Sequence, residues 1–165
     1  MTFKTRRSLL ALPLVLVLPR AFAHGDQHPK ANAPLVKEQK PWGIAAEPAK
    51  ARRTVDIRMS DDMKMTPNHL DVRVGDTLRI RAVNVGKVLH EIVIGTSEEL
   101  KAHAEMMKKF PNMEHDEPYM AHVAAGKQGE IVWTFNRPGD FEFACLIAGH
   151  FEAGMRGTIR VAPKA

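Results

Sequence analysis

Cysteine is almost missing from this sequence. Cys145 is the only one among 165 residues, so an intramolecular disulfide is excluded. In an exported protein a single cysteine is a free thiol, one half of an intermolecular bridge or a metal ligand. The residues that follow Cys145 favour a metal ligand.

A long hydrophobic run is also missing. The longest apolar stretch, residues 9–18, is too short to span a bilayer as a helix. It follows basic residues within 4–7 and precedes the small-residue cleavage site Ala21-Phe22-Ala23, so residues 1–23 predict a secretory signal peptide. The pair Arg6-Arg7 also fits a weak twin-arginine signal. We expect export to the periplasm by either route, with no membrane span in the mature chain.

Excess positive charge disappears once this signal is removed. The signal carries four basic residues and no acid, so its loss lowers the formal net charge from +5 to +1. A nearly neutral chain lacks the broad electrostatic field that nucleic-acid binding requires. No serine is placed with a histidine and an acid for nucleophilic catalysis. We therefore expect neither a nucleic-acid-binding protein nor a hydrolytic enzyme.

The segment 24–52 contains four prolines and no sustained apolar periodicity. This composition predicts a flexible N-terminal segment, with Trp42 docking on the domain that follows. Cleavage after residue 23 would leave His24 at the mature N-terminus with His28 nearby, a pattern that chelates Cu(II). A solvated tail that binds no metal is an equal alternative.

Residues 53–165 predict one domain built from short strands. Apolar and polar residues alternate over 55–59, 70–74, 78–84, 131–135 and 141–145, with further strands expected over 88–94 and 157–161. Thr96 and the acids after it begin a short helix that continues to about Lys109, and 112–127 is expected to be a long loop. Seven or eight strands with one short helical insertion predict an all-β fold, an antiparallel β-sandwich.

Three soft metal donors follow one another at regular intervals near the end of the chain. Cys145, His150 and Met155 are spaced by five residues, with a glycine before each of the last two. Cysteine, histidine and a long axial methionine are ligands of a blue-copper site, which requires one further histidine. His90, in the apolar segment 88–94, is the candidate. Each donor alone is usually a packing residue, but the four together predict a type 1 copper centre, blue or green.

The stretch from about Arg53 to Val161 resembles the cupredoxins, the small blue-copper proteins that include plastocyanin, pseudoazurin and azurin. The residues that carry the resemblance are Asn84 and Gly86 before His90, the run Pro138-Gly139-Asp140-Phe141-Glu142-Phe143, and the loop with Cys145, His150 and Met155. The resemblance implies a Greek-key β-sandwich that binds Cu(I) and Cu(II). It also implies that His90, Cys145 and His150 are the trigonal ligands and Met155 the weak axial ligand.

The chain departs from the family pattern in two places. Four residues separate Cys145 from His150, as in azurin-like loops, whereas plastocyanin-type members have two. Glu91 stands where the family often has an asparagine that helps to lock the cysteine loop. A longer loop and a changed neighbour favour a greener, more tetragonal copper.

Further methionines and histidines gather outside this motif. They are Met59, Met63 and Met65, then Met106, Met107, Met113 and Met120 with His103, His115 and His122. Thioethers select Cu(I), and imidazoles accept either copper state. Core packing is the more ordinary role for any one methionine, but the set indicates accessory copper binding without defining its ligands.

These features predict a monomeric electron-transfer protein of the periplasm. Apolar residues near His150, namely Ile147, Ala148 and Phe151, would contact a transient redox partner. The His-bearing N-terminus and Met-rich insertion resemble the cupredoxins of copper-tolerance systems, the CopI-like group, which implies sequestration of copper or its maintenance in the oxidised state. The alternative is a copper chaperone that delivers copper to a periplasmic or membrane copper enzyme. Catalytic oxidation of cuprous ion would need an open coordination position, which four protein ligands do not leave.

Overall fold

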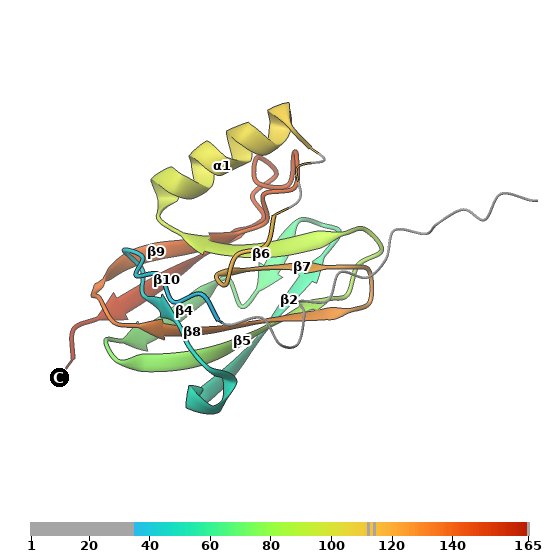
Figure 1. Ribbon diagram of the computed structural model, residues 1–165. Helices are drawn as coiled ribbons and strands as arrows, with labels where there is room; N and C mark the ends of the chain where they lie inside the picture. Colours follow the sequence, from blue (N-terminus) through green and yellow to red (C-terminus); the bar gives the residue numbers. More distant parts are fainter. Residues whose placement is uncertain (1–34, 112, 114, 165) are drawn as a thin grey trace, which may run out of the picture. The chain divides into compact units, whose positions relative to one another are not determined.

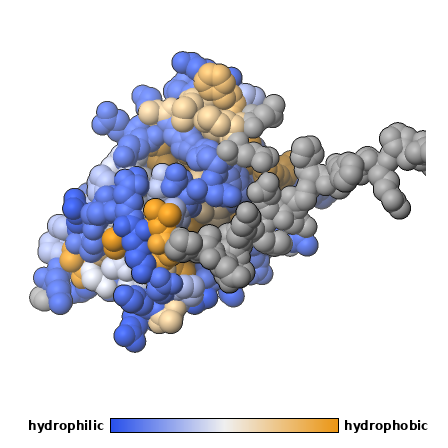
Figure 2. Space-filling model, in the orientation of Figure 1, coloured by the Kyte–Doolittle hydropathy of each residue, from blue (hydrophilic) through white to orange (hydrophobic). Residues whose placement is uncertain are grey.

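A computed structural model of the chain describes residues 35–111, 113 and 115–164. The predicted signal peptide, His24 and His28 lie outside these residues. Among the helices of the described part, none combines the length and apolarity needed to cross a membrane. Polar residues cover most of the face shown in Figure 2, where hydrophobic residues form small separate groups.

The described chain forms a β-sandwich with one α-helix on its outside (Figure 1). Its elements in chain order are β1 (Ile44–Ala45), a 3-10 helix (Pro48–Lys50), β2 (Arg53–Ser60), β3 (Lys64–Thr66), β4 (His69–Arg73), β5 (Asp76–Asn84), β6 (His90–Gly95), α1 (Ser97–Lys109), β7 (Met120–Val123), β8 (Gln128–Phe135), β9 (Gly139–Ala144) and β10 (Arg156–Ala162).

Two five-stranded sheets make up the sandwich, which confirms the predicted fold class. Their strand orders are β1-β8-β5-β2-β3 and β4-β10-β9-β6-β7. The sheets are mixed rather than purely antiparallel, because β2 pairs with β5, and β4 with β10, in parallel. The chain crosses between the sheets at β3–β4, β4–β5, β5–β6, β7–β8 and β8–β9. The strands of each parallel pair are therefore not joined by a hairpin, which would make them antiparallel.

The core lies between the two sheets. Ile57 and Ile80 from one sheet and Ile92, Phe143 and Ile159 from the other belong to one buried cluster. Strand β6 is buried at every position, because α1 covers its outer face (Figure 1). His90 and Glu91, at the start of β6, are therefore enclosed on both sides.

Helix α1 forms where the sequence predicts it. The hydroxyl of Thr96 accepts a hydrogen bond from the Glu99 backbone N–H, and the Glu99 carboxylate accepts one from the Thr96 backbone N–H, which completes a capping box. Leu100, Ala104 and Met107 share a buried face and join a second apolar cluster beneath the helix. This packing fixes α1 on the sheet that carries β6 and β9.

The described part of the N-terminal segment packs on the sandwich. Trp42 is only 3% exposed, and Trp133 Nε1 donates a hydrogen bond to its carbonyl at 3.1 Å. Strand β1 adds to the sheet edge by pairing with β8. A two-residue strand is too short to show alternation, so the sequence did not reveal that the domain extends before residue 53.

Strand β7 lies inside the segment 112–127, which the sequence analysis expected to be a loop. Only its two end residues, Met120 and Val123, are buried. This pattern lacks the two-residue alternation on which the prediction of strands depended. By pairing with β6, β7 places residues of the insertion beside the start of that strand.

Candidate metal centre

Neighbouring strands bring the first two predicted donors together. His90 begins β6, and Cys145 directly follows β9, which pairs with β6 in the antiparallel sense. The backbone N–H of Glu91 points at the cysteine sulfur, with a distance of 3.4 Å between N and Sγ. Both donor side chains are fully buried.

The loop between β9 and β10 returns the other two predicted donors to the same place. Cys145 N donates to the Met155 carbonyl at 3.0 Å, and Met155 N donates to the His150 carbonyl at 3.1 Å. Gly149 and Gly154 adopt φ values of +89° and +91°, a region that favours glycine. The backbone conformation of the loop therefore favours glycine directly before His150 and directly before Met155.

The resulting arrangement is compact. The ligand atoms of His90, Cys145 and His150 all lie within 4.8 Å of one another. Cys145 Sγ is 3.3 Å from His150 Nδ1, and the two histidine ring centroids are 5.1 Å apart. Met155 is fully buried, whereas His150 is partly exposed. One histidine edge thus connects the centre with the surface.

The donor atoms fit a copper ion. His90 Nδ1 is buried and has no hydrogen-bond partner among the described residues. Buried polar nitrogens are nearly always satisfied, and a metal ion is a suitable partner for a bare imidazole nitrogen. Together with the Cys145 sulfur and a second imidazole within 4.8 Å, this nitrogen forms a set of donors that suits copper.

The protonation of the site follows from its burial. Burial raises the pKa of the Cys145 thiol to about 12. Burial, followed by the charge of His90, lowers the pKa of His150. At neutral pH without metal, the cysteine is therefore a protonated thiol and His150 a neutral imidazole. Metal binding must release the thiol proton.

Asp61, in the turn between β2 and β3, holds His90 from the side away from the other donors. Its Oδ1 lies 3.1 Å from His90 Nε2, and Lys87 N donates to its Oδ2 at 2.8 Å. The hydrogen bond from Lys87, and then that from His90, lowers the pKa of Asp61. A carboxylate on Nε2 fixes the histidine ring and leaves Nδ1 for the metal.

The sequence analysis did not single out Asp61. It lies 29 residues before His90, beside a second aspartate, Asp62, in the same turn. The only available signal is that a metal-binding histidine normally needs a carboxylate or carbonyl partner. That signal does not say which acid supplies it.

Asn84, part of the cupredoxin-like motif, fixes the approach of the chain to His90. Its amide nitrogen donates to the carbonyls of Val88 and Val123, both at 2.8 Å. Its oxygen accepts from Gly86 N at 2.9 Å. The three bonds tie the β5–β6 connection to β7.

Glu91 holds the start of the cysteine loop, at the position where the family often has an asparagine. Its Oε1 accepts a hydrogen bond from Leu146 N at 2.8 Å. Its other oxygen, Oε2, lies 2.9 Å from His122 Nε2. Because Glu91 is only 2% exposed, its carboxylate depends on these partners. The residue joins the copper loop to the insertion.

The methionines and histidines outside the proposed copper centre differ in their burial and surroundings. Met59, Met65, Met107 and Met120 are buried in the apolar clusters, whereas Met106 and Met113 are partly exposed. Packing accounts for the buried methionines without any metal. The histidines behave differently, since His103, His115 and His122 lie near one another beside β6.

Comparisons with known proteins agree with this geometry. The family described as copper binding proteins, plastocyanin/azurin family, matches residues 51–162. The copper-resistant cuproprotein CopI of Rubrivivax gelatinosus is 49% identical, over 84% of this chain and 82% of the relative. The protein of the same name from Vibrio cholerae is 35% identical, over 94% of this chain and 99% of the relative.

Solved structures show the same fold at lower sequence identity. Auracyanin B is 22% identical with a TM-score of 0.60, covering 75% of this chain and 97% of its own. An azurin from Methylomonas sp. strain J is 14% identical with a TM-score of 0.55, covering 67% of this chain and 98% of its own. At these identities the likeness concerns the arrangement of the strands.

Proposed function

Because the chain belongs to the plastocyanin/azurin family of copper-binding proteins, we propose that it is a periplasmic type 1 copper protein that transfers single electrons. The ligands in this proposal are His90, Cys145, His150 and Met155. The observation that carries it is the approach of three donor atoms to within 4.8 Å, with a buried histidine nitrogen that has no described hydrogen-bond partner.

Bound copper would supply a one-electron Cu(I)/Cu(II) couple at these donors. The chain keeps the donors in place by three independent means. Asp61 holds the His90 ring, Glu91 holds the start of the cysteine loop, and backbone hydrogen bonds tie Met155 to Cys145. Donors fixed in this way move little when the charge of the site changes, which keeps the cost of electron transfer low.

The surface near His150 supports a transient redox contact. Ile147 and Phe151 are partly buried, and Ala148 is exposed. Val88 and Leu89, directly before His90, are 45% and 48% exposed. An apolar surface of this kind next to a partly exposed ligand suits a small, short-lived interface. The electron would enter and leave through the His150 edge.

A role in copper tolerance follows from the relatives. Two proteins that cover most of this chain are named copper-resistant cuproproteins. We propose that this chain contributes to tolerance by binding copper or by keeping it in the oxidised state. The predicted signal over 1–23 would place this activity in the periplasm.

The chaperone alternative is less favoured by the burial of the site. Cys145 and Met155 are fully buried, and a buried thiolate supports retention of copper over ready release. The proposal also includes no catalytic activity, since four protein donors leave no open position for a substrate. A chaperone would lose its copper to an acceptor protein within one encounter, whereas an electron carrier keeps it through repeated redox cycles.

Spectroscopy of the copper-loaded protein tests the centre. We expect an intense thiolate-to-copper absorption band in the wild type and its complete loss in Cys145→Ser. The matched control is His69→Ala, at an exposed histidine on β4, which should keep the band. A wild type that binds copper without this band would refute the type 1 centre.

Growth on copper tests the biological role separately. A strain that lacks the protein should regain copper tolerance with the wild type and with His69→Ala, but not with Cys145→Ser. Unchanged copper sensitivity in the deletion strain would remove the tolerance role and leave the electron carrier.

A further inference from the structure

Three histidines that the copper centre does not use come together at the edge of the sandwich. His103 lies on α1, His115 on the segment after it and His122 on β7. The rings of His103 and His115 lie against each other in a tilted arrangement, with their centroids 4.8 Å apart and an angle of 41° between the planes. The cluster therefore draws on three separate segments of the insertion.

Two ring nitrogens of the pair His103 and His115 lack a hydrogen-bond partner among the described residues. His103 Nε2 and His115 Nδ1 are both buried, and neither finds a hydrogen-bond partner among residues 35–111, 113 and 115–164. Burial lowers the pKa of His103, and the charges of His115 and His122 lower it further against the opposing charge of Glu91. The ring is thus neutral at physiological pH, the form in which histidine binds metal ions.

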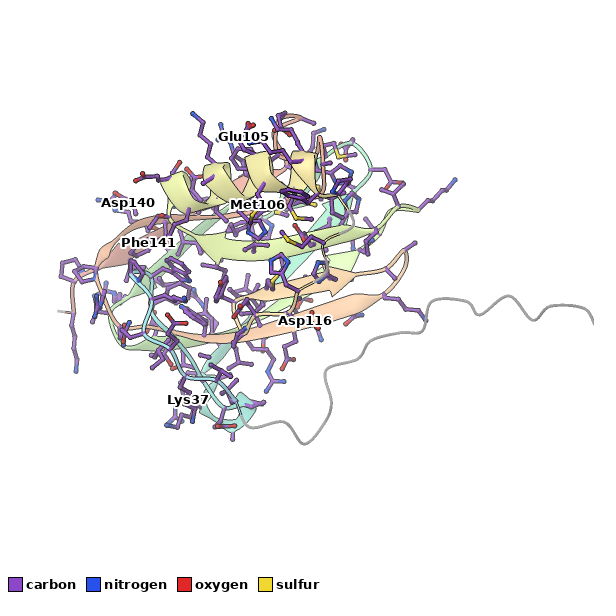
Figure 3. All side chains as sticks on the ribbon, turned by 45° about the horizontal axis from the view of Figure 1, so that its top comes forward. Lys37, Glu105, Met106, Asp116, Asp140 and Phe141 are labelled. Atoms are coloured by element: carbon purple, nitrogen blue, oxygen red, sulfur yellow. The ribbon has the colours of Figure 1, made fainter. Side chains whose placement is uncertain are left out.

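His122 is prepared for a metal in the same way as His90. A carboxylate holds its Nε2, since Glu91 Oε2 lies 2.9 Å away. Its Nδ1 faces Asp116, with 3.7 Å between Nδ1 and Oδ1. Asp116, which is labelled in Figure 3, follows His115 directly in the chain. A metal ion near His122 Nδ1 would meet a carboxylate oxygen as well as imidazole nitrogens.

We propose that His103, His115 and His122 form a second metal site that binds Cu(II), with Asp116 as an oxygen ligand. Imidazole and carboxylate donors suit a divalent borderline cation, and Cu(II) binds such donors most tightly among the first-row divalent ions. Glu91 is a positioning residue, because its carboxylate orients His122 from the opposite nitrogen. The site has no thiolate, which separates it chemically from the type 1 centre.

Binding requires a rearrangement of side chains. Among the described residues, only His90, Cys145 and His150 have donor atoms that all lie within 4.8 Å of one another. Side-chain rotation must therefore bring His103, His115 and Asp116 toward His122, which stays in contact with Glu91. The helix itself need not move, because Leu100, Ala104 and Met107 anchor it on the sheet.

The second site touches the first through one residue. Glu91 receives the Leu146 N–H with Oε1 and contacts His122 with Oε2. A cation at His122 would thus act on the carboxylate that holds the cysteine loop. We expect a small change in the thiolate-to-copper band when the second site fills.

A Cu(II) titration followed by paramagnetic resonance tests the site. The full-length variant His24→Ala/His28→Ala removes the tail imidazoles, and one equivalent of copper fills the type 1 centre first. A second equivalent should then bind with the large hyperfine splitting of a type 2 site. In the same background, adding His103→Ala and His115→Ala should weaken this second binding by about 100-fold or more. Adding His69→Ala instead should leave it unchanged.

The single variant His115→Ala repeats the test without altering the helix. Retention of the thiolate band shows that each variant is folded, and it reports on the proposed type 1 centre independently of the second site. The inference is overturned if the tail variant binds only one equivalent. It is equally overturned if the second equivalent binds with unchanged affinity after removal of His103 and His115, or is lost in the His69 control.

Discussion

The copper centre and the outer histidine cluster differ in how their donors are held. Cys145, His150 and Met155 are connected by backbone hydrogen bonds within one short loop, and His90 lies on a strand buried on both faces. The outer histidines come from a helix, the segment after it and a four-residue strand. Among the described residues, the donor atoms of His90, Cys145 and His150 are already within 4.8 Å of one another, whereas those of the outer histidines are not gathered in this way.

In both regions, nevertheless, a carboxylate orients a histidine ring. A carboxylate holds Nε2 of a histidine in the pair Asp61 and His90 and in the pair Glu91 and His122. Nδ1 has no described partner in His90, whereas in His122 it faces Asp116. What differs is the surroundings, since His90 is fully buried whereas the side chain of His122 is 30% exposed. A preassembled buried site suits retained copper, and a half-buried site that must rearrange suits exchangeable copper.

Glu91 contacts both regions, so its replacement is the strongest test of the comparison. Replacement by alanine leaves the buried Leu146 N–H without its acceptor and His122 without its carboxylate. We expect the free energy of unfolding of the metal-free protein to fall by about 3 kcal/mol. In Glu91→Gln an oxygen still accepts from Leu146, so the loss should be about 1 kcal/mol. Urea unfolding at neutral pH measures both values.

Two further observations qualify that result. The exposed Glu98 on α1 provides a matched control, and Glu98→Ala should change stability by no more than about 0.5 kcal/mol. The thiolate-to-copper band should shift in Glu91→Ala, because the cysteine loop loses its tie. If Glu91→Ala were as stable as Glu98→Ala, the two regions would not be coupled through this residue.

Asp61 and Asp62 allow a sharper test of the buried centre alone. They are adjacent in one turn, but only Asp61 contacts His90, whereas Asp62 pairs with Lys64 on the surface. Asp61→Asn should weaken copper binding at the type 1 centre by about 10- to 100-fold, since His90 loses its orienting carboxylate. Competition with a chelator measures this affinity, and Asp62→Asn should leave it unchanged. Equal losses in both variants would indicate a general effect of charge in the turn.

Local sequence was sufficient to predict the fold class and the loop of the copper centre. The structure confirms the predicted fold class. It could be predicted because the alternation of apolar and polar residues in the strands and the Thr96 cap are local signals. Cys145, His150 and Met155 were recognisable since one loop carries all three at a regular spacing. The structure places His90 beside Cys145 and His150, and the ligand roles of these residues remain a prediction.

Contacts between distant segments were not predictable in the same way. Asp61 contacts His90 from a turn that lies 29 residues earlier in the chain, and no local pattern distinguishes it from Asp62. His103, His115 and His122 share no period, and they meet only because α1 and β7 pack beside β6. The methionines of the same region were equally prominent in the sequence, but burial assigns Met107 and Met120 to packing, whereas Met106 and Met113 are exposed. Tertiary packing therefore separates histidines available for metal from methionines that fill space.

The smallest expected effect concerns the protonation of His122. The hydrogen bond that His122 donates to Glu91 is the main cause that raises the pKa of His122, with burial opposing it and the charge of Asp116 adding to it. A raised folded-state pKa stabilises the protein fully below the unfolded value of about 6.5, and this stabilisation is lost as pH rises through the folded-state value. His122→Gln should therefore cost about 1 kcal/mol near pH 5.5 and progressively less at higher pH.

Urea unfolding of the metal-free protein across pH 5–9 measures this difference, and the exposed His69→Gln provides the control. A cost that grew with pH would mean that neutral His122 is the stabilising form, which the contact with Glu91 does not allow. The same proton competes with Cu(II) for the outer histidines, so the second site should release its metal as pH falls. The buried centre should still hold copper there, because His90 is fully buried and burial lowers the pKa of His150, so protons compete less for these two histidines.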